Sequence, residues 1–282
     1  MGYIDLHNHS TASDGTDSPS ALVELADCLG LRAMSVTDHD TVAGVPEALA
    51  AGEKRGVEVV PGIEVSSDYR DNNVHILGYF IDPDSPALRP VLDWARNERE
   101  ERNEKILAHM AADGFDISLE QLRTEYPGAV LGRPHMAEHL MLRGYTSSVQ
   151  EGFDRYLDVG RPYYLPKRRI SIRQAVEVIL AAGGVPVLAH PFQYRYPLGE
   201  VEEMIVHARD LGVRALECYY SEHSARQQSW LLSAAERYGL GVSGGSDCHG
   251  TRKPHISMGT GTGSLAVPYS VLEELRSLRP PV

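Results

Sequence analysis

The sequence predicts an α/β protein whose sheet closes into a barrel. Strand-like and helix-like segments alternate over most of the 282 residues, and repeated strand–helix units form parallel sheets, either open or closed. One block, roughly residues 98–168, interrupts the alternation with helical segments alone. Without that block the chain is near the short end for an eight-unit barrel, so we expect fewer than eight strand–helix units.

The first part of the chain supplies four expected strands and two expected helices. The first helix has a Ser18 cap, Pro19 at its first position and a stop at Gly30, which are typical helix boundary signals. The second helix ends at Gly56. The expected helices cover residues 18–29 and 45–55, and the expected strands cover 3–6, 33–37, 57–60 with 63–65, and 75–80.

The middle block begins with a long charged helix over residues 86–110 and continues with shorter helical pieces at 119–124, 134–143 and 148–157. The alternation then resumes with strands at 185–189, 215–219 and 240–243 and with helices at 172–182, 201–211, 225–238 and 271–278. We therefore predict a barrel-like domain formed by residues 1–97 and 169–282, and a helical insertion that covers residues 98–168.

Composition and charge disfavour several classes of protein. Hydrophobic residues make up 42% and charged residues 23% of the chain, as in ordinary soluble domains. The chain has no signal-peptide pattern and no apolar run of membrane-spanning length, and its 3 cysteines show no paired spacing. We therefore expect a cytoplasmic protein that binds no membrane. The formal net charge of −12 argues against binding of duplex DNA, and the oligomeric state stays unknown.

The first chemical signal is a His-x-His pair, His7 and His9, directly after the first expected strand. Side chains alternate along an extended segment, so both imidazoles point to the same side. Two neutral imidazoles on one side provide half of a site for a divalent transition metal. Taken alone, such a pair is more often a surface or core feature than a pair of ligands.

Further candidate ligands lie at the ends of the other expected strands or in the loops just past them. They are Asp14, His39, Glu64, His75, His190, Asp247 and His249. Singly, each of these histidines is better explained as a packed core or loop residue. Barrel enzymes, however, build their active sites at the carboxyl ends of their strands. The joint placement therefore predicts one metal-binding cluster at the mouth of the barrel.

The motifs around these residues resemble those of a known family. They are His7-Asn8-His9-Ser10, Ser13-Asp14-Gly15, Thr37-Asp38-His39-Asp40, Pro61-Gly62-Ile63-Glu64, Ala189-His190-Pro191 and Ser246-Asp247-Cys248-His249, and they are similar to the signature motifs of PHP (polymerase and histidinol phosphatase) domains of the amidohydrolase superfamily. The resemblance implies a distorted (β/α)7 TIM-like barrel, here with an inserted helical domain. It also implies an enzyme that hydrolyses phosphate esters with two or three divalent metal ions, most often manganese, with iron or zinc as alternatives.

The resemblance implies roles for the individual ligands as well. His7, His9 and Asp247 would hold a first metal ion, His75 and His190 a second, and Glu64 would bridge the two. Asp14, His39 and His249 would form a third site, although some family members have His where Asp14 stands. A hydroxide held between two metal ions is available near neutral pH, so no side-chain nucleophile is required. It would act beside Asp247 and His249.

Within the family, the chain looks most like the branch that acts on nucleoside 3′,5′-bisphosphates and on short RNA ends. The likeness rests on the inserted helices and on the runs at residues 99–105, 132–135 and 161–167. Arginine suits bidentate contacts to phosphate, but a helix of alternating Glu and Arg is often only a solvated surface. The basic run 167–169 is expected to send one side chain to the site. The expected substrate-binding residues are Arg99, Arg102, Asn103, Arg133, His135 and Lys167.

The favoured reaction is removal of the 3′-phosphate from a nucleoside 3′,5′-bisphosphate, which gives a nucleoside 5′-monophosphate. Three alternatives stay open: a phosphatase for a non-nucleotide phosphomonoester such as histidinol phosphate, a 5′–3′ exonuclease on short RNA, and a metal-binding regulatory domain without turnover. The complete set of candidate ligands disfavours the regulatory domain. The basic runs favour phosphate esters over the C–N bonds that related metal barrels hydrolyse.

Overall fold

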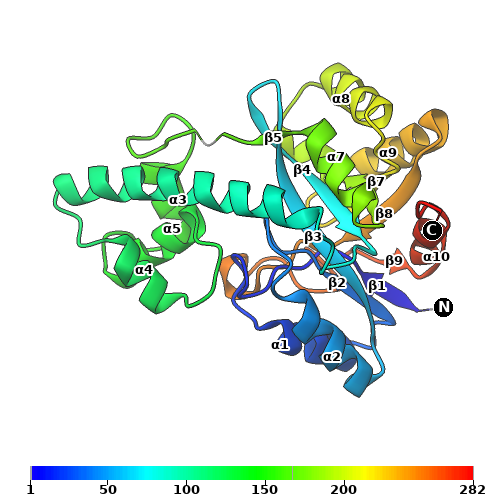
Figure 1. Cartoon of the computed structure of the whole chain (residues 1–282), viewed down its shortest axis with the longest axis horizontal. Coiled ribbons are helices and arrows are strands. Elements are labelled where there is room, and N and C mark those ends of the chain that lie inside the picture. Colours follow the sequence, from blue (N-terminus) through cyan, green and yellow to red (C-terminus); the bar gives the residue numbers. More distant parts are fainter. Residues whose placement is uncertain (1, 167, 282) are drawn as a thin grey trace.

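A nine-stranded sheet, rolled almost into a barrel, forms the centre of the molecule in the computed structural model, which describes residues 2–166 and 168–281 (Figure 1). The strand order is β8-β7-β6-β4-β3-β2-β1-β9, and the short β5 pairs with β3. The strands are β1 Tyr3–Asp5, β2 Ala33–Val36, β3 Glu58–Tyr69, β4 Asn72–Tyr79, β5 Ile170–Ser171, β6 Val185–Leu188, β7 Ala215–Tyr220, β8 Gly241–Gly245 and β9 Val267–Pro268. Without the marginal β5 and β9, the other seven strands agree with the expected (β/α)7 barrel.

The barrel is nearly closed where β8 meets β1. The Leu6 amide donates to the Gly244 carbonyl at 3.2 Å, and the Asp247 amide donates to the His7 carbonyl at 2.8 Å. The strands approach so closely here that a Cβ on Gly245 would lie 2.3 Å from the His7 nitrogen. Only glycine fits at this position. We call this junction the β1–β8 seam.

One expectation about the sheet is wrong, because the sheet is not parallel throughout. Strand β4 is antiparallel to both β3 and β6. Strands β3 and β4 form a hairpin whose turn places Arg70 (φ 50°) and Asp71 (φ 65°) in the left-handed region. A two-residue connection suits an antiparallel pair, whereas a parallel crossover needs a dozen residues or more. This hairpin distorts the barrel and extends β3 well beyond the expected strand.

Helices cover the outside of the barrel, and their ends follow the signals in the sequence. The Ser18 hydroxyl accepts from the Ala21 amide at the start of α1, and Gly56 adopts a left-handed conformation (φ 74°) after α2. Apolar side chains of these helices pack on the strands in the main core clusters. The barrel helices are α1 Pro19–Cys28, α2 Val45–Arg55, α7 Ile172–Ala181, α8 Leu198–Asp210, α9 Ala225–Tyr238 and α10 Ser270–Ser277, with 3₁₀ turns at Pro191–Tyr194 and Gly250–Arg252.

The expected insertion projects from one side of the barrel (Figure 1, green). Its elements are α3 Leu88–Ala112, α4 Leu119–Glu125, α5 Arg133–Leu142, α6 Val149–Gly152 and a π-helical turn at Phe153–Leu157. Leu88 at the start of α3 belongs to the barrel core, whereas Ile106 and Met110 belong to a separate apolar cluster with Leu140 of α5. The predicted boundary at residue 98 therefore falls within α3, and it stays a prediction. None of the helices in the described part of the chain is both long and apolar enough to cross a membrane.

Candidate active site

The nine predicted ligands converge at the mouth of the barrel. His7 and His9 follow β1, His39 follows β2, His190 follows β6, and His249 follows β8. Their ligand atoms form four overlapping groups, within each of which all atoms lie within 4.8 Å of one another. The groups are His9, Asp14, His39 and His249; His7, Glu64 and His190; His7, His9 and Asp247; and His39, Glu64 and His75.

Glu64 occupies the centre of the cluster and is fully buried. Its Oε1 lies 2.9 Å from His75 Nδ1 and 2.9 Å from His190 Nε2. Its Oε2 lies 3.2 Å from His9 Nε2 and 3.5 Å from His7 Nε2. The two carboxylate oxygens thus face two different sets of imidazoles, which is the arrangement that a bridging ligand requires.

Asp247 turns one oxygen toward the cluster and the other away from it. Its Oδ1 lies 3.5 Å from His7 Nε2 and 3.2 Å from His9 Nε2. Its Oδ2 accepts hydrogen bonds from the Tyr220 hydroxyl at 2.8 Å and from Lys253 Nζ at 2.7 Å. These two donors leave Oδ1 as the oxygen that faces the imidazoles.

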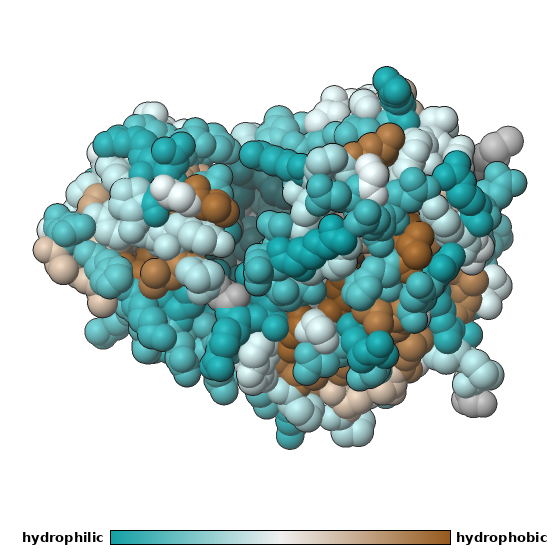
Figure 2. Space-filling view, turned by 90° about the horizontal axis from the view of Figure 1, so that it is seen from above, coloured by the Kyte–Doolittle hydropathy of each residue, from teal (hydrophilic) through white to brown (hydrophobic). Residues whose placement is uncertain are grey.

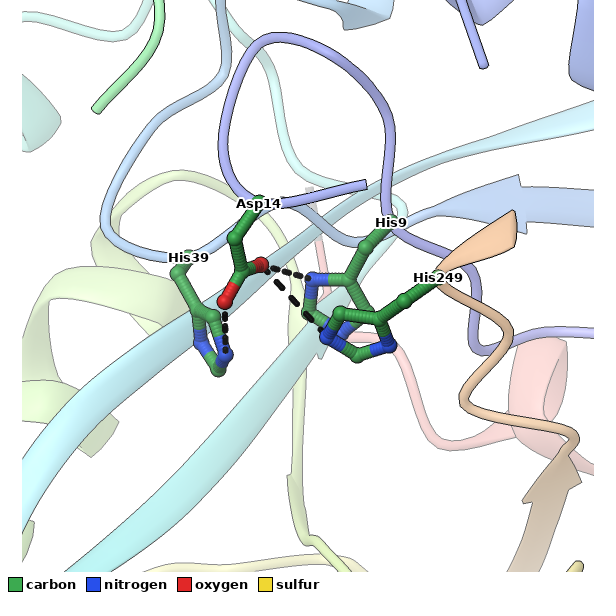
Figure 3. A group of neighbouring side chains, drawn as sticks. All are labelled: His9, Asp14, His39 and His249. Atoms are coloured by element: carbon green, nitrogen blue, oxygen red, sulfur yellow. Dashed lines mark ion pairs between the residues drawn. The ribbon is translucent and has the colours of Figure 1, made fainter. Parts of the chain in front are cut away.

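Asp14 lies among three histidines at the outer side of the cluster (Figure 3). Its Oδ1 is 3.6 Å from His9 Nδ1 and 3.4 Å from His249 Nε2, and its Oδ2 is 3.8 Å from His39 Nε2. His9 therefore presents one ring nitrogen to this set and the other to Glu64 and Asp247. The sequence did not indicate this shared position. We refer to His9, Asp14, His39 and His249 as the Asp14 group.

The polar atoms of the cluster fit divalent metal ions. Several buried atoms have no hydrogen-bond partner of suitable geometry among the described residues: His7 Nε2, both ring nitrogens of His9, His39 Nδ1, Glu64 Oε2 and His75 Nδ1. Buried polar atoms rarely lack partners without a reason. Imidazole nitrogens and carboxylate oxygens are ligands for manganese, iron and zinc. Metal ions held by these atoms would account for the missing partners.

Electrostatics shows that the buried carboxylates of the cluster require positive charge. Burial alone would raise the pKa of Glu64, but the imidazoles of His75 and His39 hold the pKa of this carboxyl well below its usual range. Burial opposes charge on His7 as well, yet Glu217 and Glu64 raise the pKa of its imidazole well above the usual value. Several buried carboxylates that lie this close together need positive charge nearby. Protons on imidazoles or metal cations can supply it.

Sequence reasoning missed a carboxylate that orients two of these histidines. The Glu217 Oε1 accepts from His7 Nδ1 at 2.8 Å, and its Oε2 accepts from the His190 amide at 2.7 Å. A hydrogen bond at Nδ1 fixes the tautomer that leaves the other ring nitrogen free for a metal. Glu217 stands alone among apolar residues of β7, where a fully buried carboxylate is unusual. That isolation was its only signal in the sequence.

A cavity of about 210 Å³ adjoins the cluster and is shared by the barrel and the insertion. The space-filling view shows a hydrophilic recess between these two parts (Figure 2). The lining combines three predicted ligands, four arginines and five other residues. The lining residues are Asp14, His39, Ser66, Asn73, His75, Arg99, Arg102, Arg133, Pro134, Phe153, Tyr164 and Arg169.

The predicted substrate-binding arginines differ in how many protein groups already pair with their guanidinium charge. Arg99 donates to Asp40 at 2.6 Å, and Arg133 donates to the Leu157 carbonyl at 2.8 Å. Among the described residues, the Arg102 side chain donates a hydrogen bond only to Asn103 Oδ1, at 3.3 Å. Burial, together with the neighbouring Arg99, lowers the pKa of Arg102 to about 9. The cavity thus holds more positive charge than its own residues neutralise.

Two other predicted substrate-binding residues, Asn103 and His135, lie outside the cavity lining. Asn103 is buried, and its Nδ2 donates to the Leu131 carbonyl at 2.9 Å. His135 is also buried, and its Nδ1 accepts from the Gly132 amide at 3.1 Å. Lys167 lies outside the described residues. Of its basic run, Arg169 lines the cavity, whereas the largely exposed Arg168 pairs with Glu98.

Comparisons with known proteins agree with this site. The family model for the PHP domain matches residues 5–182. A 3′,5′-nucleoside bisphosphate phosphatase of Chromobacterium violaceum is 34% identical over 88% of each chain. A 5′–3′ exoribonuclease of Haemophilus influenzae is 33% identical over 87% of this chain and 89% of the relative. The solved structure of a predicted metal-dependent phosphoesterase from Bifidobacterium adolescentis superposes with a TM-score of 0.90 at 28% identity and covers 100% of this chain and 98% of the other. The matching family model and the similarity to these relatives, together with the barrel, show that the chain belongs to the PHP domain family.

Proposed function

We propose that this protein hydrolyses the 3′-phosphate of nucleoside 3′,5′-bisphosphates to give a nucleoside 5′-monophosphate and inorganic phosphate. Family membership makes the protein a metal-dependent phosphoesterase, and the substrate is the proposed part. One observation carries the proposal: the cavity lined by His39 and His75 is lined by four arginines as well. A substrate with two phosphates can place one at the ligand cluster and the other among the arginines.

The ligand roles in this proposal are those that the family resemblance implies, and the position of Glu64 Oε1, 2.9 Å from both His75 and His190, supports them. His7, His9 and Asp247 would hold one metal ion, and His75 and His190 a second, with Glu64 shared between them. Asp14, His39 and His249 would hold a third ion, with His9 close by. Manganese is the ion we expect first. Bound divalent ions would neutralise phosphate oxygens and lower the pKa of water from 15.7 towards about 7.

The protein itself would supply orientation around the reacting phosphate. Glu217 fixes His7, and Tyr220 and Lys253 fix Asp247, so the ligand atoms do not need to reorganise during the reaction. Burial lowers the pKa of His249 to about 4, so its imidazole is neutral at physiological pH. Its Nδ1 faces the Asp247 carbonyl at 2.9 Å, which leaves the lone pair on Nε2 for the Asp14 side.

The arginines would bind the non-reacting phosphate. Arg102 and Arg133 are both largely buried, and burial lowers the pKa of each guanidinium. A bound phosphate dianion would raise both pKa values again, because it stabilises the charged form. Each charge-assisted hydrogen bond contributes about 1.5–3 kcal/mol. Tyr164 and Phe153 line the same cavity and lie beside the Arg133 guanidinium, at 5.3 and 5.9 Å from it. Their rings restrict where that guanidinium can point.

A second candidate function is 5′–3′ exonuclease activity on short RNA. The similarity to a 5′–3′ exoribonuclease favours it, and both activities would use the arginine-lined cavity for the same group. A terminal 5′-phosphate would lie among the arginines, while the bond on the 3′ side lies at the ligand cluster. The two activities differ only in whether the 3′-phosphate carries a further nucleotide.

A panel of substrates with the manganese-loaded protein tests the proposal. It should contain adenosine 3′,5′-bisphosphate, AMP, histidinol phosphate and a short 5′-phosphorylated RNA. We expect the bisphosphate to have the highest kcat/KM and to yield 5′-AMP, identified by chromatography. An Asp247→Asn protein purified in parallel should be inactive and controls for contaminating phosphatases. Preference for histidinol phosphate, equal rates on AMP, or 3′-AMP as the product would contradict the proposal.

A further inference from the structure

The loop that carries Asp14, residues 10–17, is fixed on the barrel side by one carboxylate. The Ser10 amide donates to Asp38 Oδ1 at 2.8 Å, and the Ser13 hydroxyl donates to the same oxygen at 2.5 Å. The loop also packs directly against His9, because a Cβ on Gly15 would lie 2.0 Å from the His9 carbonyl oxygen. Further contacts to this loop come from the insertion and from the segment that follows His249.

Arg252 holds the outer side, and it connects three parts of the chain. It lies three residues after His249, and its side chain is only 5% exposed. Its Nε donates to Glu138 Oε2 of α5 at 2.8 Å, and its Nη2 donates to the same oxygen. Its Nη1 donates to the Gly15 carbonyl at 3.3 Å. One guanidinium thus joins the insertion, the Asp14 loop and the segment that follows His249.

His135 contacts the same loop from the insertion. Its Nδ1 accepts from the Gly132 amide, and the ring lies close to the Ser13 backbone, next to Asp14. Its Nε2 lies 3.4 Å from Arg252 Nη1. A third link comes from Val130, whose amide donates to the Ala12 carbonyl at 3.0 Å. His135 is therefore oriented toward the loop backbone and does not line the cavity.

We propose that Arg252, Glu138 and His135 are positioning residues through which the insertion fixes Asp14 for metal binding. The inference rests on the proposed metal-binding role of the Asp14 group. The Asp14 oxygens lie 3.4–3.8 Å from the nearest ring nitrogens of His249, His9 and His39. Ligand side chains must be held within about 0.5 Å of the productive geometry, so a shift of the loop by about 1 Å would weaken the binding of an ion between these atoms. The insertion and the Asp14 group then form one structural unit. The insertion, which would bind the substrate, would therefore also control metal binding at the Asp14 group.

Manganese binding to the metal-free full-length protein, measured by calorimetry and elemental analysis without substrate, tests this inference. The variants are Arg252→Met and Glu138→Gln, with Asp14→Ala as the reference for loss of the site. Arg237→Met is the control for loss of an arginine, because Arg237 of α9 forms a largely exposed ion pair with Glu202 of α8. Loss of an outer partner of a metal ligand weakens metal affinity about tenfold to hundredfold. We expect both variants to weaken the manganese binding that Asp14→Ala removes, and Arg237→Met to leave it unchanged.

His135→Gln separates positioning from direct contact with phosphate. We expect the His135→Gln protein to bind manganese more weakly. Its KM for the bisphosphate should return to the wild-type value when enough manganese is added to fill the site. Intact manganese binding with a raised KM would overturn the inference and make His135 a phosphate ligand. Unchanged manganese binding in Glu138→Gln, or in Asp14→Ala itself, would overturn it too. If Arg252→Met does not fold, Glu138→Gln decides. Failure of the substrate panel would refute only the proposed substrate, because manganese is measured without it.

Discussion

Replacing Arg102 by methionine should raise the stability of the ligand-free protein and lower its catalytic efficiency on the bisphosphate. The Arg102 side chain is largely buried, its Nε has no hydrogen-bond partner among the described residues, and its Nη2 bonds only to the Asn103 amide oxygen. Burial and the positive charges of Arg99 and Arg133 lower its pKa to about 9. The guanidinium is thus held charged in a place that disfavours charge, where an anionic ligand would compensate it.

The lowered pKa gives the size of the effect on stability. One pKa unit corresponds to about 1.4 kcal/mol, and arginine in the unfolded chain has a pKa near 12.5, so the buried charge costs several kcal/mol at most. This cost is complete at pH values below the folded-state pKa and falls as the pH rises from there toward the unfolded-state value. Methionine keeps an apolar stem of similar length. We expect the midpoint of thermal unfolding to rise by several degrees, since about 1 kcal/mol corresponds to about 2–4 °C in proteins somewhat smaller than this one.

The loss of activity should depend on the substrate. A missing charge-assisted hydrogen bond of about 1.5–3 kcal/mol lowers kcat/KM for adenosine 3′,5′-bisphosphate roughly tenfold to a hundredfold. p-Nitrophenyl phosphate has no second phosphate, so its kcat/KM should change less than about threefold. Steady-state kinetics on both substrates and calorimetric unfolding of the same preparation measure all three quantities. A lower unfolding midpoint together with equal losses on both substrates would refute the reasoning, because Arg102 would then be a structural cation.

Four other predictions follow from the site. Chelation should abolish activity, added manganese should restore it, and manganese at about a hundred times its Kd should stabilise the protein by about 2.7 kcal/mol in thermal unfolding. Glu64→Gln should lower turnover more than about a hundredfold and reduce bound metal, because the bridging charge is lost; near-normal turnover would exclude the bridge. Glu217→Gln should weaken metal affinity about tenfold to a hundredfold in equilibrium dialysis. Arg133→Ala should lower bisphosphate turnover about tenfold to a hundredfold but spare p-nitrophenyl phosphate, and should lower the unfolding midpoint, because Arg133 also holds the Leu157 carbonyl.

Local signals in the sequence were sufficient for most elements and for the convergence of the ligand side chains. Caps and stops such as Ser18 and Gly56 act within one helical turn, so the sequence predicts them without knowledge of the fold. The histidines and carboxylates were predicted to meet because strand ends share one rim of a barrel. The β3–β4 hairpin was misjudged, although the short link through Arg70 and Asp71 leaves no space for a crossover helix.

Residues that act through contacts distant in the sequence could not be predicted. Glu217 accepts from His7, 210 residues away, and Arg252 binds Glu138, 114 residues away. Neither Glu217 nor Arg252 lies in a motif with recognisable spacing. His135 was predicted from its motif to bind the substrate, and that role stays a prediction. Its contact with the Asp14 loop could not be predicted, because it depends on the packing of the insertion against that loop.

The β1–β8 seam determines when the metal site can form during synthesis of the protein. Asp5 near the start of the chain accepts a hydrogen bond from the Ser246 amide, across 241 residues. His7 and His9 lie on one side of the seam, and Asp247 and His249 lie on the other. A ribosome must therefore synthesise the chain at least as far as residue 249 before these predicted ligands can meet, and contacts between residues so far apart in the sequence form slowly. Metal capture should then be a late event of biosynthesis, and a captured ion would keep the first and last barrel strands together.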